Sequence, residues 1–251
     1  MIELQSLTVG YGNKVVLSDI NQTLNAGQMV CLLGANGVGK STILRTIANF
    51  QPPLSGKILL DGQDLTSLSI SERSKAVAVV LTERVEVPYM TVRNLVGMGR
   101  SPYTGFFGKL SKEDNIIVDE AIEMVGIGNL AERTIDTLSD GERQKALLAK
   151  ALAQQTPVIL LDEPTAFLDF HAKVSTLRLM LRLAHETNKT ILLSTHDVEM
   201  AIQLSDVLWI VQNSQIQAGT TALLTENGTL QQFLQAEGIA YNTEDHTLKI
   251  T

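Results

Sequence analysis

The sequence predicts an α/β fold in which helices cover a buried, mainly parallel sheet. Two observations carry this prediction. Short apolar runs recur between stretches with helix signals, and they lie at 29–33, 77–81, 158–163 and 190–197. The first run leads directly into a glycine-rich turn and a helix start, an arrangement typical of this class. With 251 residues, the chain can form one large domain or one domain with an inserted lobe.

Composition limits the function classes. The net charge of −7 disfavours a general nucleic-acid binder, which needs a basic face, although a local basic patch stays possible. Cys31, the single cysteine, lies within an apolar run, so we expect a buried small hydrophobe and no disulfide within the chain. The first residues lack a basic segment before an apolar run, and no stretch is long enough to span a bilayer. We therefore expect a cytoplasmic protein that is soluble by itself.

The stretch after the first apolar run has the residue types that bind phosphate. Its glycines can adopt backbone angles closed to other residues, so successive N–H groups point into one concavity at the positive end of the new helix. Lys40 can then reach the β- and γ-phosphates of a nucleotide, and the Ser41 hydroxyl can bind the Mg²⁺ that bridges them. A glycine-rich turn without a ligand is disfavoured, because strand, spacing, lysine and serine all agree. The predicted nucleotide-binding residues are Gly34, Ala35, Asn36, Gly37, Val38, Gly39, Lys40, Ser41 and Thr42.

The first 24 residues contain short alternating apolar groups that predict antiparallel strands. A further strand before the turn Asp61-Gly62 closes this sheet. Tyr11 lies in the turn 10–12, where an aromatic face is free to stack on an adenine ring. A tyrosine in a loop is more often only a surface residue, so this role depends on the glycine-rich stretch downstream.

A helical lobe is predicted from about residue 82 to residue 153, with a loop over 97–108 between its helices. A glycine at 126 stops the second helix. Capping residues mark three helix starts, at Thr91, at Ser111 with Asp114, and at Ser139 with Glu142. Taken alone, the last of these is an ordinary helix start.

Two carboxylates and a histidine lie at the carboxyl ends of the last two runs, at the edge where α/β sheets bind ligands. Adjacent residues of a strand point to opposite faces, so Asp162 and Glu163 are expected to differ in role. One can hold the Mg²⁺ shell while the other reaches an attacking water. An acidic loop after a core strand is the plain alternative, which the phosphate-binding stretch disfavours. His196 has this placement, whereas the surface is expected for His171, His185 and His246.

The end of the chain carries no chemistry that we can assign. Residues 207–211 and 215–217 predict a hairpin through Asn213-Ser214. A short helix near 230–235 and a last strand are expected after it.

In this order, the motifs resemble the ATP-binding subunit of ABC transporters over residues 2–219. The resemblance implies an α/β fold with a P-loop NTPase (RecA-like) core, an N-terminal antiparallel β subdomain and an inserted helical subdomain. It makes 1–219 an ABC ATPase domain and 220–251 a C-terminal extension of that domain. ATP and Mg²⁺ are the implied ligands.

The resemblance also assigns roles to single residues. It implies that Glu163 polarises the attacking water, while His196 holds that water and the γ-phosphate and Lys40 completes the catalytic set. Of the family motifs, the adenine-stacking aromatic corresponds to Tyr11, Walker A to 34–42, and the signature to 138–142 with Ser139 and Gly141. Walker B corresponds to Asp162 and Glu163, the D-loop to Leu168-Asp169, and the switch histidine to His196.

The partners follow from the same resemblance. It implies a head-to-tail dimer in which the helix starting at Ser139 donates N–H groups to the γ-phosphate held by Lys40 of the other copy. It also implies an integral membrane permease, an indirect link to a substrate-binding protein, no nucleic acid, and a place on the inner face of the cell membrane. The run 99–106 and its spacing to Asp114 look like the importers of iron–siderophore, haem and cobalamin.

Two positions depart from the family pattern. Asp140 replaces the second glycine of the signature, a change we expect an exposed helix start to tolerate. Thr82-Glu83 stands where the family has a glutamine, which puts the usual link from Mg²⁺ to the permease in question. Since a carboxylate near the triphosphate meets like charge, we expect Thr82 to face the nucleotide and the metal-bound water. Glu83 then faces the membrane partner.

Other functions fit the sequence less well. A soluble ABC-type ATPase without a permease, serving cofactor assembly, DNA repair or translation, is the main alternative. Repair relatives carry long heptad insertions and translation relatives carry two fused nucleotide domains, and this sequence has neither. A P-loop kinase would have no use for the signature, and exporters commonly fuse the membrane span to the ATPase.

The residues at 82 and 83 give a prediction that distinguishes their roles. Glu83→Ala is expected to lower permease-stimulated hydrolysis and transport while it leaves the basal ATPase rate of the isolated subunit nearly unchanged. Thr82→Ala is expected to lower both rates, because its hydroxyl acts at the nucleotide. Both rates are measured for both variants. An isolated subunit as impaired by Glu83→Ala as the complex would show that the two assignments are reversed.

Overall fold

The computed structural model of the chain describes residues 1–81, 87–105, 108–236, 238–242 and 247–250. Its strands are β1 (Ile2–Tyr11), β2 (Lys14–Leu24), β3 (Met29–Leu33), β4 (Ser55–Leu60), β5 (Gln63–Asp64), β6 (Val77–Val80), β7 (Val158–Leu161), β8 (Thr190–Ser194), β9 (Val207–Gln212), β10 (Gln215–Gly219), β11 (Ile239–Asn242) and β12 (Thr247–Ile250). Its α-helices are α1 (Lys40–Ile47), α2 (Ile70–Ala76), α3 (Val92–Gly97), α4 (Lys112–Met124), α5 (Asp140–Ala153), α6 (Phe170–Thr187), α7 (Val198–Leu204), α8 (Thr221–Glu226) and α9 (Thr229–Ala236).

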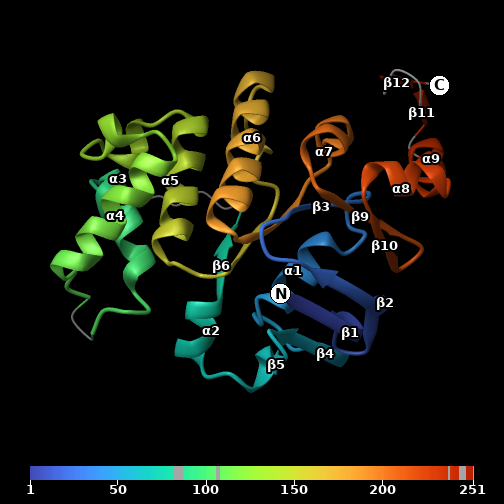
Figure 1. The fold of residues 1–251 in the computed structure, drawn as a ribbon, viewed down its shortest axis with the longest axis horizontal. Coiled ribbons are helices and arrows are strands. Elements are labelled where there is room, and N and C mark those ends of the chain that lie inside the picture. Colours follow the sequence, from blue (N-terminus) through green and yellow to red (C-terminus); the bar gives the residue numbers. More distant parts are fainter. Residues whose placement is uncertain (82–86, 106–107, 237, 243–246, 251) are drawn as a thin grey trace.

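Two sheets form the centre of the fold. Among the described residues, one sheet has the strand order β10-β9-β3-β8-β7-β6, and an antiparallel sheet has the order β2-β1-β4-β5. In the first sheet, β3 pairs in parallel with both β8 and β9, and β7 pairs in parallel with both β6 and β8. Figure 1 shows α3, α4 and α5 gathered at one end of the molecule, away from the antiparallel sheet. The predicted α/β class and the antiparallel N-terminal strands are confirmed.

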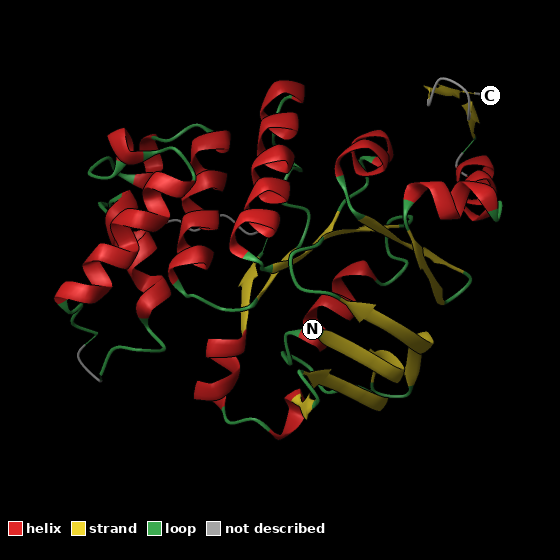
Figure 2. Cartoon of the chain, viewed as in Figure 1, coloured by secondary structure: helices red, strands yellow, loops and turns green. Residues whose placement is uncertain are grey.

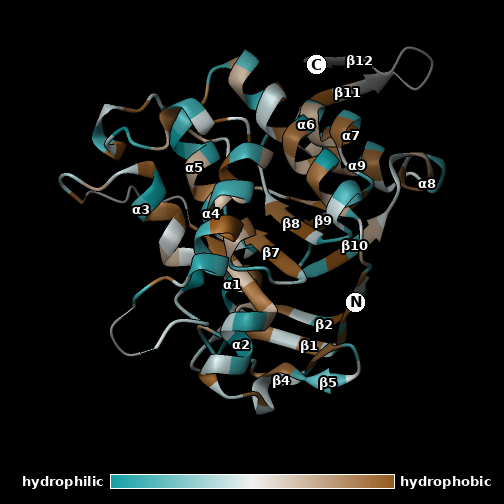
Figure 3. Cartoon of the chain, turned by 60° about the vertical axis from the view of Figure 1, so that its left-hand side comes forward, coloured by the Kyte–Doolittle hydropathy of each residue, from teal (hydrophilic) through white to brown (hydrophobic). Residues whose placement is uncertain are grey.

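The larger sheet is buried on both faces, as its apolar runs predicted. Met29, Cys31 and Leu33 of β3 belong to the core formed with the helical lobe and α6. Val30 and Leu32 of the same strand pack instead with α1 and the antiparallel sheet. Alternate residues of β3 therefore stabilise two different cores. Strands β7 and β8 of this sheet appear brown, and so apolar, in Figure 3.

Cys31 behaves as the sequence predicted. It is buried, and burial raises the pKa of its thiol to about 12, so the reactive thiolate is not formed near neutral pH.

The predicted helix starts are confirmed. Side-chain caps form at Thr91, and capping boxes form at Ser111 with Asp114 and at Ser139 with Glu142. The hairpin of β9 and β10 turns through Asn213 and Ser214, which both have positive φ, as a type I′ hairpin turn requires. Short α9 and the terminal β12 also lie where the sequence placed them.

Several elements of the structure differ from those that the sequence predicted. The long helix α6 was not predicted, nor were α2, α7 and α8, and Figure 2 shows α6 as a full-length helix beside the sheet. The loop predicted from residue 97 begins later, because Met98–Arg100 continues α3 as a 3-10 turn. Of the helices described, none combines the length and apolar character that crossing a bilayer requires.

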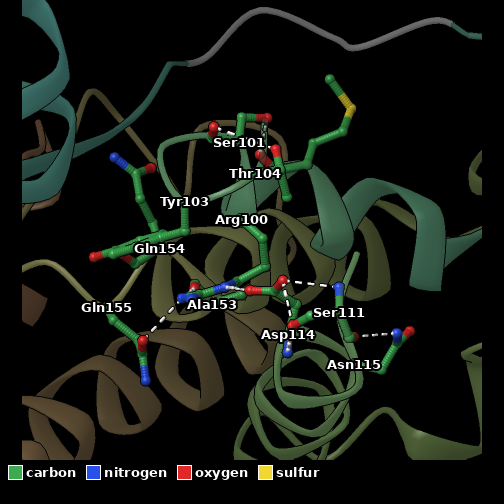
Figure 4. Close-up of polar contacts among 11 residues, drawn as sticks. Arg100, Ser101, Tyr103, Thr104, Ser111, Asp114, Asn115, Ala153, Gln154 and Gln155 are labelled. Atoms are coloured by element: carbon green, nitrogen blue, oxygen red, sulfur yellow. Dashed lines mark hydrogen bonds and ion pairs between the residues drawn. The ribbon is translucent and has the colours of Figure 1, made fainter. Parts of the chain in front are cut away.

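A buried polar cluster joins the helices of the helical lobe to one another. Arg100 is 4% exposed, and its guanidinium donates to Asp114 Oδ1, the Ala153 carbonyl and Gln155 Oε1, each at 2.8 Å (Figure 4). The guanidinium also lies 4.0 Å from the centre of the Tyr103 ring. The fork of Arg100 thus joins the start of α4 to the end of α5.

The segment at Gly99 lies close to α5, and the residue after α5 bonds to the segment that leads into the central sheet. A Cβ at Gly99 would lie 2.3 Å from the Lys150 carbonyl oxygen, so only glycine permits this contact. Gln154 Nε2 donates to the carbonyls of Ser74 and Val77, at 2.6 and 3.2 Å. The end of α5 is therefore bound to the other helices of the lobe on one side and to the α2–β6 segment on the other.

Breaking the buried ion pair should destabilise the protein. Arg100→Met is expected to lower the free energy of unfolding by about 3 kcal/mol, because it leaves Asp114 without its buried cation. Urea unfolding near neutral pH measures this change. The control Arg93→Met removes exposed pairs with Glu132 and Asp119 and should cost less than about 1 kcal/mol. Equal losses in both variants would contradict the structural role of Arg100.

The pH dependence follows from Asp114. Hydrogen bonds from Ser111, with a further contribution from Arg100, lower the pKa of Asp114 from 3.8 to about 2. A carboxyl with a lowered pKa adds stability above its unfolded pKa and loses it as the pH falls through the folded pKa. The stability difference between wild type and Asp114→Asn should therefore shrink as the pH falls from 3.8 towards about 2.

Candidate functional site

The predicted phosphate-binding stretch connects β3 to α1. β3 is buried along its length, and α1 begins at Lys40 with Gly39 as its N-cap at φ 118°. A Cβ at Gly39 would lie 2.6 Å from Cγ1 of Val16, so both the backbone angle and the available space require glycine. No side chain caps this helix. The helix start is shaped to accept an anion from outside the chain.

Lys40 lies across the mouth of this loop. It is 6% exposed, and its ammonium donates to the carbonyls of Gly34 and Ala35, at 2.7 and 3.2 Å. Thr42 Oγ1 donates to the Tyr11 hydroxyl at 3.3 Å, which places the half-exposed Tyr11 ring beside the start of α1. The structure thus brings together the cation, the loop and the aromatic residue that the sequence assigned to one nucleotide.

The two carboxylates follow β7, and Ser194 at the end of β8 joins them. The Ser194 hydroxyl donates to Asp162 Oδ1 at 2.7 Å and accepts the N–H of Glu163 at 2.9 Å. Asp162 in turn donates its N–H to the Val80 carbonyl of β6 at 3.0 Å. Three neighbouring strands therefore fix the positions of both acidic residues.

His196 reaches the same place from β8. Its Nδ1 lies 3.7 Å from Glu163 Oε2, which is too long for a hydrogen bond but close enough for an electrostatic interaction. The His196 side chain is 54% exposed and that of Glu163 is 29% exposed. Both groups are therefore accessible to water and to a ligand.

Asp162 and Glu163 do not alternate along a strand, so that expectation is wrong. β7 ends at Leu161, and Glu163 has φ 46°, in the left-handed region. The turn, and not strand alternation, separates the two carboxylates. Asp162 accepts a hydrogen bond from Ser194, while Glu163 faces His196.

The residues assigned to the signature and the D-loop lie at the starts of α5 and α6. Ser139 accepts the Glu142 N–H at 3.3 Å, and Glu142 accepts the Ser139 N–H at 2.9 Å, which lowers the pKa of the Glu142 carboxyl. Asp169 accepts the Ala172 N–H at 2.8 Å. Within the described residues, Ser139, Gly141 and Asp169 make no hydrogen bond with 34–42. One chain therefore does not bring the two sets of predicted ligand-binding residues together.

The oxygen donors near the loop suit Mg²⁺. Ser41 offers a hydroxyl from the first turn of α1, and Ser194 orients the carboxylate of Asp162. In the part of the chain that the structure describes, no three His, Cys, Asp or Glu side chains form a metal site by themselves. This donor set fits an ion that takes its other ligands from phosphates and water. Thr82, the third predicted metal contact, and Glu83 lie outside the described residues.

Comparison with known proteins identifies the family. Residues 17–166, more than half of the chain, match the family described as ABC transporter. The chain belongs to the ABC transporter family. It is an ABC-type ATPase, as its motifs predicted.

Relatives and solved structures agree with this assignment. The chain is 42% identical to an uncharacterized ABC transporter ATP-binding protein of Methanocaldococcus jannaschii, over 86% of this chain and 74% of the relative. It is 36% identical to the iron(3+)-hydroxamate import ATP-binding protein FhuC of Bacillus subtilis, over 94% of this chain and 88% of the relative. The dimeric structure of a bacterial ABC transporter cassette superposes with a TM-score of 0.74 at 25% identity, covering 88% of this chain and 99% of that one.

Ser194 is the site residue that the sequence analysis did not single out. It is fully buried and contacts both acidic residues. The available signal was a hydroxyl residue directly after the apolar residues 191–193 and two positions before His196. Only the pairing of β8 beside β7 shows what that hydroxyl binds.

Proposed function

We propose that this chain is the ATP-hydrolysing subunit of an ABC importer that powers uptake of an iron chelate (siderophore), haem or cobalamin through a separate membrane permease. The observation that carries the proposal is the group formed by Asp162, Glu163 and His196 around Ser194, one strand away from the loop that holds Lys40. The likeness to an iron(3+)-hydroxamate import protein supports the cargo class.

The geometry suggests a role for each residue in hydrolysis. Lys40 already bonds to the loop carbonyls, so its ammonium needs only to turn to neutralise the β- and γ-phosphates. Ser41 and Asp162 would hold Mg²⁺, which supplies charge neutralisation at the phosphate oxygens. Glu163 is accessible enough to orient and polarise the attacking water. His196, on the other side of that water, would hold the γ-phosphate.

The nucleotide-binding residues complete the site. Tyr11 would stack on the adenine, and the N–H groups of the loop would surround the phosphates. These residues are Gly34, Ala35, Asn36, Gly37, Val38, Gly39, Lys40, Ser41 and Thr42.

We infer a dimer because, within the described part of one chain, the signature and D-loop residues do not bond to the phosphate loop. Ser139, Gly141 and Asp169 lie at helix starts that do not bond to the phosphate loop of their own chain. A second copy in head-to-tail orientation would bring the N–H groups of its α5 to that loop, where the positive helix end favours the γ-phosphate. Docking on the permease would hold this dimer at the inner face of the membrane, with only an indirect link, through the permease, to a substrate-binding protein.

Glu163→Gln should separate ATP binding from hydrolysis. The amide keeps the shape of the side chain but cannot act as a base, so turnover should fall at least about a hundredfold while ATP still binds. With Mg²⁺ and ATP, this variant should form a dimer in size-exclusion chromatography with light scattering. The matched control Lys40→Ala should lose tight ATP binding itself, because it removes the cation that faces the phosphates.

Uptake by cells distinguishes the importer from a soluble ATPase. Chromosomal Glu163→Gln should abolish uptake of at least one among a labelled iron(3+) chelate, haem and cobalamin. Normal uptake of all three, with the ATPase activity abolished, would favour an ABC-type ATPase without a permease. Near-normal ATP affinity of Lys40→Ala would contradict the nucleotide site itself.

A further inference from the structure

A groove of about 670 Å³ lies outside the nucleotide site, between the end of α4 and helices α5 and α6. Its walls include Glu123 at the end of α4, Lys145 of α5, and His171, Arg178 and Arg182 of α6. No residue of the phosphate loop lines it. It is therefore a separate candidate site on this chain.

The lining is basic although the chain as a whole is acidic. Lys145, Arg178 and Arg182 oppose one carboxylate, Glu123, in a protein with a net charge of −7. The local basic patch that the composition left possible is found here. Such a concentration of like charge attracts anions.

The two arginines of α6 that line the groove have few anionic partners among the described residues. Arg178 and Arg182 stand one turn apart on the same face, an arrangement of like charges that destabilises a helix. Arg182 donates to the Met124 carbonyl at 3.2 Å and lies 3.9 Å from Glu186. Arg178 has no hydrogen bond or ion pair with any residue in the described part of the chain. A bound anion would supply the missing partner.

We propose that this groove binds a small polyanion, a molecule with two or more phosphate or carboxylate groups. The volume lies within the range of small-molecule sites, about 300–1,000 Å³. Arg178 and Arg182 provide forked donors that match phosphate and carboxylate oxygens, and Lys145 provides a third charge from the opposite wall. The exposed rings of Phe170 and His171, which pack edge to face, give the groove an apolar end for the rest of the ligand.

Calorimetry with inorganic tripolyphosphate tests the proposal. The protein is saturated with ADP first, so that the phosphate loop is occupied. Arg178→Glu should weaken the remaining tripolyphosphate binding about tenfold or more, because it replaces a charge-assisted donor by a repelling carboxylate. Lys112→Glu makes the same charge change at the far end of α4 and should leave the affinity unchanged.

Three outcomes would overturn the polyanion site. The first is no binding once ADP is present. The second is equal weakening in both variants, which would show a general effect of net charge. The third is binding of polyglutamate but not of tripolyphosphate, which would assign the groove to an acidic protein segment.

A different observation supports a second inference, at the residue after His196. Lys173 Nζ lies 2.6 Å from Asp197 Oδ2, and both side chains are largely buried, at 20% and 25% exposed. Lys173 lies one turn into α6, and its N–H donates to the Asp169 carbonyl at 2.9 Å. Asp197 precedes α7 but does not cap it, so its carboxylate is directed to Lys173.

We infer that Lys173 is a positioning residue that sets the place of His196 through Asp197, an inference that rests on the proposed role of His196. The imidazole of His196 has no close hydrogen bond among the described residues, since its Nδ1 is 3.7 Å from Glu163. Its position is therefore set by the backbone segment that carries it. A partly buried ion pair fixes that segment against α6, the helix that Asp169 caps.

Steady-state kinetics and histidine NMR test this inference together. Lys173→Met should lower kcat about tenfold with little change in the KM for ATP, and Lys173→Arg should restore most of it. The double variant Lys173→Met, Asp197→Asn should be no slower than the slower single variant, as expected for one shared interaction. The ring signals of His196 should shift in Lys173→Met but not in the control Lys112→Met.

The readouts separate this inference from the proposed function. Unchanged His196 signals in Lys173→Met would overturn the positioning role, whatever the ATPase rate. An equal fall in thermal stability and activity, not restored by arginine, would indicate a merely structural ion pair and would also overturn it. Loss of the proposed function itself would appear as a Glu163→Gln variant that hydrolyses ATP at the wild-type rate.

Discussion

The candidate site depends on three parallel strands, β3, β8 and β7, that lie side by side and end at one edge of the sheet. Their order delivers the phosphate loop, Ser194 and Asp162 to neighbouring positions although more than a hundred residues separate the first from the last. Parallel pairing demands crossover connections, and those crossovers contain both the helical lobe and α6. The positions of the site residues are thus a consequence of the strand order. The helices connect the strands and cover the faces of the sheet.

At that edge, short polar contacts replace regular strand pairing. The hydroxyl of Ser194 satisfies both the carboxylate of Asp162 and the N–H of Glu163 in a place where unpaired polar groups would be costly. The left-handed backbone at Glu163 is uncommon for a residue with a side chain and turns its carboxylate towards His196. A single serine therefore donates a hydrogen bond to one acidic residue and accepts one from the other, and the Glu163 carboxylate stays partly exposed.

Much of the fold and part of the candidate site could be predicted from local sequence, because caps, glycine loops and apolar runs are local features. The capping boxes at Ser111 and Ser139 and the glycine-rich loop are of this kind. The contacts of Ser194 and of Lys173 could not be predicted, since each joins segments distant in sequence through strand order or helix packing. The missed helix α6 is different. Its cap at Asp169 and the spacing of Leu177, Met180 and Ala184 were readable, as all three apolar residues are buried on one face.

Helix α5 connects the two ends of the proposed mechanism. Its first residues carry Ser139 and Gly141, and its last turn is bound by Arg100 from the lobe and followed by Gln154, which bonds to the α2–β6 segment. The helix has 14 residues, so these ends lie about 21 Å apart at 1.5 Å per residue. Arg100 thus holds the last turn of α5 next to the start of α4, and in the proposed dimer the opposite end of the same helix carries the signature residues.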